Sequence, residues 1–183
     1  MKDEILVAYS TRHESTREIA SAIVEVLRAA KLPVMFEPID TIGDLRGFRA
    51  AILGCAIYGG DWLPGAAEFL ERHARDLAGM PVWIFASGPL EPVPEGTKAD
   101  IPEAVVAAIE KIGPRDIALF AGSLQPHHLG TGLRMLAKLA RMHFGDHRDW
   151  SAIERWAGTI RDDLLGHVVT AIDETRREAL DTF

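Results

Sequence analysis

Ile5–Ala20 reads ILVAYSTRHESTREIA, an apolar run followed by a hydroxyl-rich turn and the start of a helix. The run Ile5–Tyr9 is typical of a parallel strand that is buried on both faces. Beyond the turn, apolar residues recur at helical spacing from Ile19 to Ala30 and form one stripe. A strand that enters a helix through a polar turn predicts the first half of a βαβ unit.

Four further apolar runs predict four more strands, and helical patterns lie between them. Pro64 is placed to open a helix that reaches Leu77, and Pro102–Ile112 has the spacing of another helix. Alternation of strands and helices implies right-handed crossovers, so we expect an α/β fold with a parallel sheet between two helical layers. The additional strands are predicted at Val34–Ile39, Ala50–Ala56, Pro81–Ser87 and Asp116–Ala121.

The last third of the chain is less regular. Helices are predicted at Leu133–Phe144 and Ser151–Leu165, and Val168–Thr182 is predicted to be a C-terminal helix or tail. This last part is too short to bury a core of its own. We therefore expect one domain at 1–165, with an inserted helical segment at about 125–145, followed by a helix or tail at 166–183.

Composition and charge exclude several classes of function. The 183 residues are 48% hydrophobic with a net charge of -7, which argues against disorder and against binding of nucleic acid. The single cysteine, Cys55, cannot form an intrachain disulfide and sits in a predicted core strand. No apolar run has the length of a signal peptide or a membrane span, so we expect a cytoplasmic protein.

The turn after the first strand is the candidate phosphate site. Amide groups in the first turn of a helix lack intrahelical partners, and the helix dipole favours an anion there. Ser15 and Glu18 also fit a capping box, which predicts a helix start near residue 15; an alternative is that the hydroxyls only cap this helix. Neither a dinucleotide-binding glycine fingerprint nor a nucleoside-triphosphate loop is present in the sequence. The candidate residues are Ser10, Thr11, Arg12, His13, Glu14, Ser15 and Thr16.

Two more loops follow the third and fourth strands, and ligands of such sheets bind beyond the carboxyl ends of the strands. In the first loop a glycine pair allows close approach of backbone to a ligand, and two aromatic residues could stack on a planar ring. Its alternative is a glycine turn whose aromatics cap the sheet edge. The candidates are Ala56, Ile57, Tyr58, Gly59, Gly60, Asp61 and Trp62, and in the second loop Ser87, Gly88, Pro89 and Leu90.

The strand, turn and helix of Ile5–Ala20 resemble those of the flavodoxin-like protoporphyrinogen dehydrogenases. The likeness recurs in collinear order over most of the first 165 residues, in Leu53–Leu77, Ala121–Leu124, the helix from Arg134 to Leu139, and Asp149–Trp150. It implies a flavodoxin-like three-layer sandwich with a five-stranded parallel sheet of order 2-1-3-4-5. It also implies FMN as cofactor, with its phosphate at residues 10–16 and its ring against the other two loops.

One departure from the family lies in the phosphate loop, where His13-Glu14 stands in place of Asp-Gly. Glycine adopts a positive φ freely, whereas another residue loses about 1–2 kcal/mol there. Two outcomes are open. Either Glu14 points to solvent and Arg12 or Arg17 compensates its charge, or the loop takes a different path.

The segment after the fifth strand carries two weaker candidates. His127 and His128 could donate protons or pair with a substrate carboxylate, because histidine titrates near neutral pH; solvated surface histidines are the alternative. Leu133–Phe144 is a basic amphipathic stretch that could rest on an anionic membrane surface, pack on the domain or form a homodimer contact.

The resemblance implies an FMN-dependent oxidoreductase that takes electrons from a small organic substrate, such as a porphyrinogen, and passes them to a quinone. One alternative is a flavodoxin-type electron carrier that docks with a redox protein. Another is a flavodoxin-fold binding protein that has lost FMN, for which Glu14 is the main support. We assign no catalytic side chain and no metal site.

Overall fold

The computed structural model describes residues 4–88, 91–124 and 145–180, with residues 167–180 as helix backbone. Its main sheet contains five parallel strands in the order β2-β1-β3-β5-β6, and the short β4 pairs antiparallel with β3. When the short β4 is left out and the five parallel strands are numbered in chain order, this is the predicted order 2-1-3-4-5. The bounds are β1 Glu4–Ser10, β2 Val34–Pro38, β3 Phe48–Tyr58, β4 Asp61–Trp62, β5 Val82–Ser87 and β6 Asp116–Phe120.

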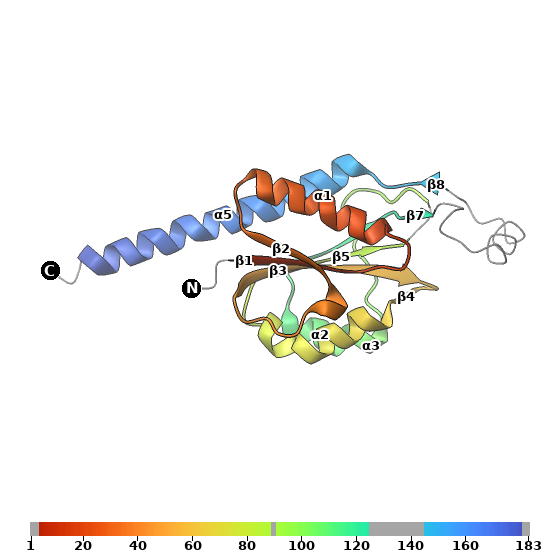
Figure 1. Ribbon diagram of the computed structural model, residues 1–183, viewed down its shortest axis with the longest axis horizontal. Helices are drawn as coiled ribbons and strands as arrows, with labels where there is room; N and C mark the ends of the chain where they lie inside the picture. Colours follow the sequence, from red (N-terminus) through yellow and green to blue (C-terminus); the bar gives the residue numbers. More distant parts are fainter. Residues whose placement is uncertain (1–3, 89–90, 125–144, 181–183) are drawn as a thin grey trace, which may run out of the picture.

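Helices cover both faces of the sheet (Figure 1), as expected for a three-layer sandwich. α1 and α5 lie on one face and α2 and α3 on the other. Helix α2 begins at Pro64, as predicted, because proline suits the first helical position. The bounds are α1 Ser15–Ala29, η1 (a single 3-10 turn) Ile39–Thr41, α2 Pro64–Leu77, α3 Glu103–Ile112 and α5 Trp150–Leu180.

Each central strand supplies side chains to two cores in turn. In β1, Ile5 and Val7 pack with α1 and α5, whereas Leu6 and Ala8 pack with α2. All four are fully buried. This alternation is the expected consequence of a strand whose successive side chains point to opposite faces, and it fixes the register on which the loops at the strand ends depend.

Two features of the fold were not predicted. A two-stranded antiparallel sheet joins β7 Ser123–Leu124 to β8 Gly145–Asp146. In addition, two separate C-terminal segments were predicted, divided near residue 165. In the structure one continuous helix, α5, runs through this point. Gly166 weakens a helix by about 1 kcal/mol relative to alanine, which is too little to end it. The predicted helix Leu133–Phe144 lies outside the described residues.

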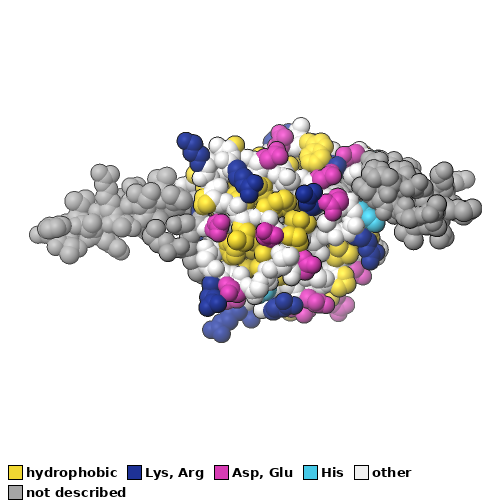
Figure 2. Space-filling model, viewed as in Figure 1, with side chains coloured by type: hydrophobic (Ala, Val, Ile, Leu, Met, Phe, Trp, Pro, Cys, Tyr) yellow, Lys and Arg dark blue, Asp and Glu magenta, His cyan; other side chains and the backbone are white. Residues whose placement is uncertain are grey.

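Acidic and basic side chains are interspersed on the face shown in Figure 2, with apolar side chains between them. Single-sign patches therefore do not dominate this face. Within the described residues, helices long and apolar enough to cross a membrane are absent.

Cys55 lies in the core between the sheet and α2, with its side chain fully buried. Burial raises the pKa of its thiol to about 12, so the reactive thiolate is scarce at neutral pH. We expect the native protein to resist a thiol-specific reagent and to be labelled only as fast as it unfolds. A labelling time course in buffer, with the denatured protein as control, checks this; rapid stoichiometric labelling of the native protein would contradict it.

Candidate functional site

A pocket opens where β1, β3, β5 and β6 end at their carboxyl edge. Four chain segments that are far apart in the sequence meet there, as the predicted topology requires. Among the described residues that line it, Asp and Glu are absent. Its volume is about 190 Å³. The lining residues are Thr11, His13, Ser15, Thr16, Ala56, Ile57, Tyr58, Gly59, Ser87, Gly88, Gly122, Ser123 and Leu124.

The phosphate loop keeps the path that a glycine would favour, although Glu14 occupies the position. Glu14 has a φ of 65°, in the left-handed region, and its backbone carbonyl accepts the first bond of α1 from the Glu18 amide. Its half-exposed carboxylate accepts a hydrogen bond from Arg17 at 3.2 Å. The sequence left two outcomes open, and the structure shows the one in which Glu14 points to solvent and Arg17 compensates its charge. Glu14 therefore leaves the path of the phosphate loop intact.

The predicted capping box is wrong, although the helix does begin at Ser15. Ser15 is the first helical residue rather than the cap, and its Oγ accepts a hydrogen bond from the Ser123 amide at 2.9 Å. The carboxylate of Glu18 turns toward Arg148 instead of the helix start. A contact across 108 residues of chain has thus replaced a local one.

Replacing Glu14 by glycine should stabilise the fold by about 1 kcal/mol, because the positive φ then carries no steric cost. The substitution also removes a negative charge beside the proposed phosphate site, so FMN should bind more tightly. Lys31→Gly is the matched control, since Lys31 has a φ of 61° far from the pocket. Urea unfolding and FMN titration of both variants check this. If FMN affinity changed equally in Glu14→Gly and Lys31→Gly, loss of the negative charge at position 14 would not explain the tighter binding.

In the second loop, the structure brings the first four candidates to the pocket and turns the others away. Gly59 and Gly60 form the two-residue turn of the β3–β4 hairpin with φ values of 64° and 93°. Tyr58 stands at the rim, 37% exposed, and partial burial raises the pKa of its phenol. Its ring lies 5.9 Å from the His13 ring, and the Arg12 guanidinium lies 5.3 Å above it.

Trp62 does not line the pocket, contrary to the expectation that it could stack on a ring there. Its side chain is 4% exposed and packs in the core with α2. The physical reason is the pairing of β4 with β3, which sets Trp62 opposite Ile57 and turns its side chain toward the helix. Asp61 and Gly60 are exposed and also do not line the pocket. Ser10 and Arg12 flank the lining residues without belonging to them.

The third loop contributes Ser87 and Gly88, and among the glycines that line the pocket only Gly88 is packed so closely that a glycine is required. A Cβ atom there would lie 2.7 Å from the Ile57 Cβ and 2.9 Å from the Ile57 carbonyl oxygen. The absence of a side chain therefore allows the second and third loops to approach each other. Pro89 and Leu90 lie outside the described residues, as do His127, His128 and the stretch Leu133–Phe144.

A fourth segment, Gly122 to Leu124, also lines the pocket and was not among the predicted site residues. Its signal in the sequence was the run AGSL directly after the last strand, at the same edge of the sheet as the other loops. Ser123 joins this segment to the start of α1 through the Ser15 contact.

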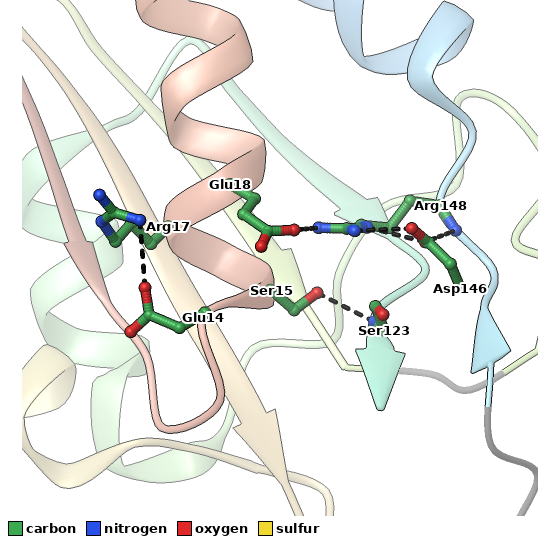
Figure 3. A network of polar contacts seen from close by, with 7 residues as sticks. All are labelled: Glu14, Ser15, Arg17, Glu18, Ser123, Asp146 and Arg148. Carbon is green, nitrogen blue, oxygen red and sulfur yellow. Dashed lines mark hydrogen bonds and ion pairs between the residues drawn. The ribbon is translucent and has the colours of Figure 1, made fainter. Parts of the chain in front are cut away.

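An ion-pair network around the buried Arg148 side chain joins the start of α1 to β8 (Figure 3), where Arg148 pairs with the partly exposed Glu18 and Asp146. The Arg148 side chain is 6% exposed, and its guanidinium lies 4.4 Å from the centre of the Trp150 ring. The hydrogen bond from Arg148 lowers the pKa of the Asp146 carboxyl from its usual value of 3.8. Asp146 and Arg148 are therefore both charged at neutral pH.

A parallel three-layer sandwich with a hydroxyl-rich helix start at its topological switch point defines a class of proteins that bind phosphate-bearing cofactors. Residues 6–149 match the flavodoxin domain family, which is most of the chain. The chain therefore belongs to the flavodoxin family.

Solved structures support the same fold. A flavodoxin from the domain Archaea has a TM-score of 0.58 at 12% identity and covers 87% of this chain and 97% of its own. Flavodoxin 2 from Bacillus cereus has a TM-score of 0.57 at 20% identity, over 87% of this chain and 99% of its own. The rubredoxin oxygen:oxidoreductase of Desulfovibrio gigas has a TM-score of 0.59 at 14% identity, over 91% of this chain but 37% of its own. A search of curated proteins found no match.

Family membership confirms FMN as the cofactor expected from the sequence. The donor set of the pocket also fits this molecule. Hydroxyl groups from Thr11, Ser15 and Thr16 surround the start of α1 and suit a phosphate, and the described lining residues include no acidic side chain that would repel it. Tyr58 and the close approach at Gly88 suit a flat ring system.

Proposed function

We propose that this protein is an electron carrier of the flavodoxin type, which exchanges electrons with a redox protein through bound FMN. The observation that supports this most is the position of the pocket at the molecular surface, with Tyr58 at its rim and one third exposed. A ring held beside Tyr58 would have an edge near the surface, where a partner protein can approach it.

The chain's own residues would bind and orient the cofactor. Thr11 and Thr16 would donate hydroxyl hydrogen bonds to the phosphate, together with amides of the first turn of α1. Ser15 would donate as well, because its oxygen already accepts from Ser123 while its O–H proton is available for a further bond. Backbone groups of Ser87 and Gly88 would meet the polar edge of the ring. FMN supplies the redox chemistry when bound.

Reconstitution and partner assays test this proposal. The purified protein, mixed with FMN and freed of excess by gel filtration, should show the visible absorbance of bound flavin. NADPH with a flavodoxin reductase should then reduce it, and cytochrome c should reoxidise it rapidly. Protein that stays colourless after this treatment would contradict the proposal.

A second candidate is oxidation of a protoporphyrinogen-like substrate with transfer of electrons to a quinone. It is favoured by the collinear likeness of Ile5–Ala20, Leu53–Leu77 and Asp149–Trp150 to the flavodoxin-like protoporphyrinogen dehydrogenases. In this function His127 and His128 would contact the substrate, and Leu133–Phe144 would reach the membrane surface or a second copy of the chain. Turnover of protoporphyrinogen with a quinone, and flotation with anionic vesicles, would support this candidate over the carrier.

A further inference from the structure

Two contacts attach the β7–β8 sheet to the first turn of α1, and both involve buried groups. The Ser123 amide donates to Ser15 Oγ at 2.9 Å, and Arg148 forms an ion pair with Glu18, which lies in the same first turn of α1. Ser15 and Ser123 also line the pocket. The attachment therefore reaches the place where the phosphate of FMN is expected.

Arg148 has a fully determined position in this attachment. Its Nε donates to Asp146 Oδ1 at 2.8 Å and its Nη2 to Asp146 Oδ2 at 2.6 Å, a bidentate pair in which the guanidinium plane is fixed. Its Nη1 is then aimed at Glu18, and Trp150 stacks against the guanidinium (Figure 3 shows the two ion pairs). The arginine thus joins β8 and α1 into one connected unit.

The charges of this unit also bear on the phosphate site. Glu18 is the acidic residue in the first turn of α1, where a carboxylate would compete with an anionic ligand for the positive end of the helix. Arg148 neutralises that carboxylate from its buried position. Loss of Arg148 would leave the Glu18 and Asp146 carboxylates close together without a cation between them.

We propose that Arg148 is a positioning residue for the FMN phosphate, which holds the first turn of α1 against β7–β8 and neutralises Glu18. This inference rests on the proposed binding of FMN. It concerns only the phosphate half of the site. It therefore predicts a change in the ratio of FMN affinity to riboflavin affinity, which a general loss of stability would not produce. Affinity for FMN should depend on Arg148, and affinity for riboflavin, which has the same ring without the phosphate, should not.

The test is a pair of titrations, of FMN and of riboflavin, on the Arg148→Met variant. FMN affinity should fall about tenfold, within the usual coupling of residues in one ion-pair network, while riboflavin affinity stays within about twofold. Arg155→Met is the matched control, because Arg155 lies in α5, close to Arg148 in the sequence, and pairs with Glu95 away from the pocket. Unchanged ratios of FMN to riboflavin affinity in Arg148→Met would overturn the proposal.

Two further variants separate the two tasks of Arg148, which are to neutralise Glu18 and to hold the first turn of α1. In the double variant Arg148→Met/Glu18→Gln the repulsive carboxylate is gone, so part of the FMN affinity should return. Arg148→Lys keeps the charge but loses the bidentate geometry, so it should give an intermediate ratio of FMN to riboflavin affinity. If Arg148→Met fails to fold, this lysine variant carries the test against Arg155→Lys, and a wild-type ratio would overturn the proposal.

A further measurement keeps failure of the FMN proposal distinct from failure of this one. Hydrogen exchange of the Glu18 amide, which donates to the Glu14 carbonyl in the first turn of α1, should be faster in flavin-free Arg148→Met than in flavin-free Arg155→Met. If wild-type protein binds neither flavin, the proposed function fails, and this exchange experiment still judges the positioning role. Equal exchange rates in the two variants would overturn it.

Discussion

Replacing Gly54 by alanine should lower the free energy of unfolding by about 2 kcal/mol, because the new methyl group overpacks the core. Gly54 lies in the middle of β3, between β1 and β5. A Cβ atom there would lie 2.4 Å from Phe85 Cζ and 2.8 Å from Phe85 Cε1. The Phe85 ring is fully buried, and the rings of Phe120 and Trp156 are each centred 6.0 Å away, so it cannot turn aside.

Urea unfolding followed by circular dichroism measures this effect. Gly158→Ala is the matched control, because it lies in α5 and its nearest neighbour would be Arg161 Nη2 at 3.9 Å. That helical substitution should stabilise the protein by about 0.5–1 kcal/mol. A Gly54→Ala variant that unfolds at the wild-type urea concentration would show that the ring can move at little cost.

Removing two hydroxyls from the phosphate loop should weaken FMN binding by about 1–3 kcal/mol, because each hydroxyl can donate a hydrogen bond to the charged phosphate. The variant is Thr11→Ala with Thr16→Ala. Both threonines line the pocket, and Thr16 is only 1% exposed, so water replaces its hydroxyl poorly. Riboflavin, which lacks the phosphate, should bind the variant and the wild type alike.

Isothermal titration with both flavins measures this difference. Thr41→Ala serves as control, since its hydroxyl donates to the Pro38 carbonyl at 2.7 Å at a distance from the pocket. FMN affinity equal to that of the wild type would place the phosphate away from residues 10–16.

The strands were predictable because burial on both faces leaves a continuous apolar run, and Ile5–Tyr9 is the clearest case. The topology then placed three loops at one edge of the sheet, and residues of all three line the pocket. The turn of Trp62 into the core was not predictable, since it follows from the pairing of a two-residue strand. The Ser15–Ser123 contact was also out of reach, because local patterns carry no information about partners 108 residues away.

The pairing of Leu124 with Gly145 has a practical consequence for protein engineering. Because these two residues are direct partners in one small sheet, the two ends of the sequence between them are anchored at neighbouring points. Closing a loop depends only weakly on its length, at about 0.6 kcal/mol for each doubling. This junction is therefore a natural place to splice a reporter or a docking peptide beside the pocket, which Leu124 lines.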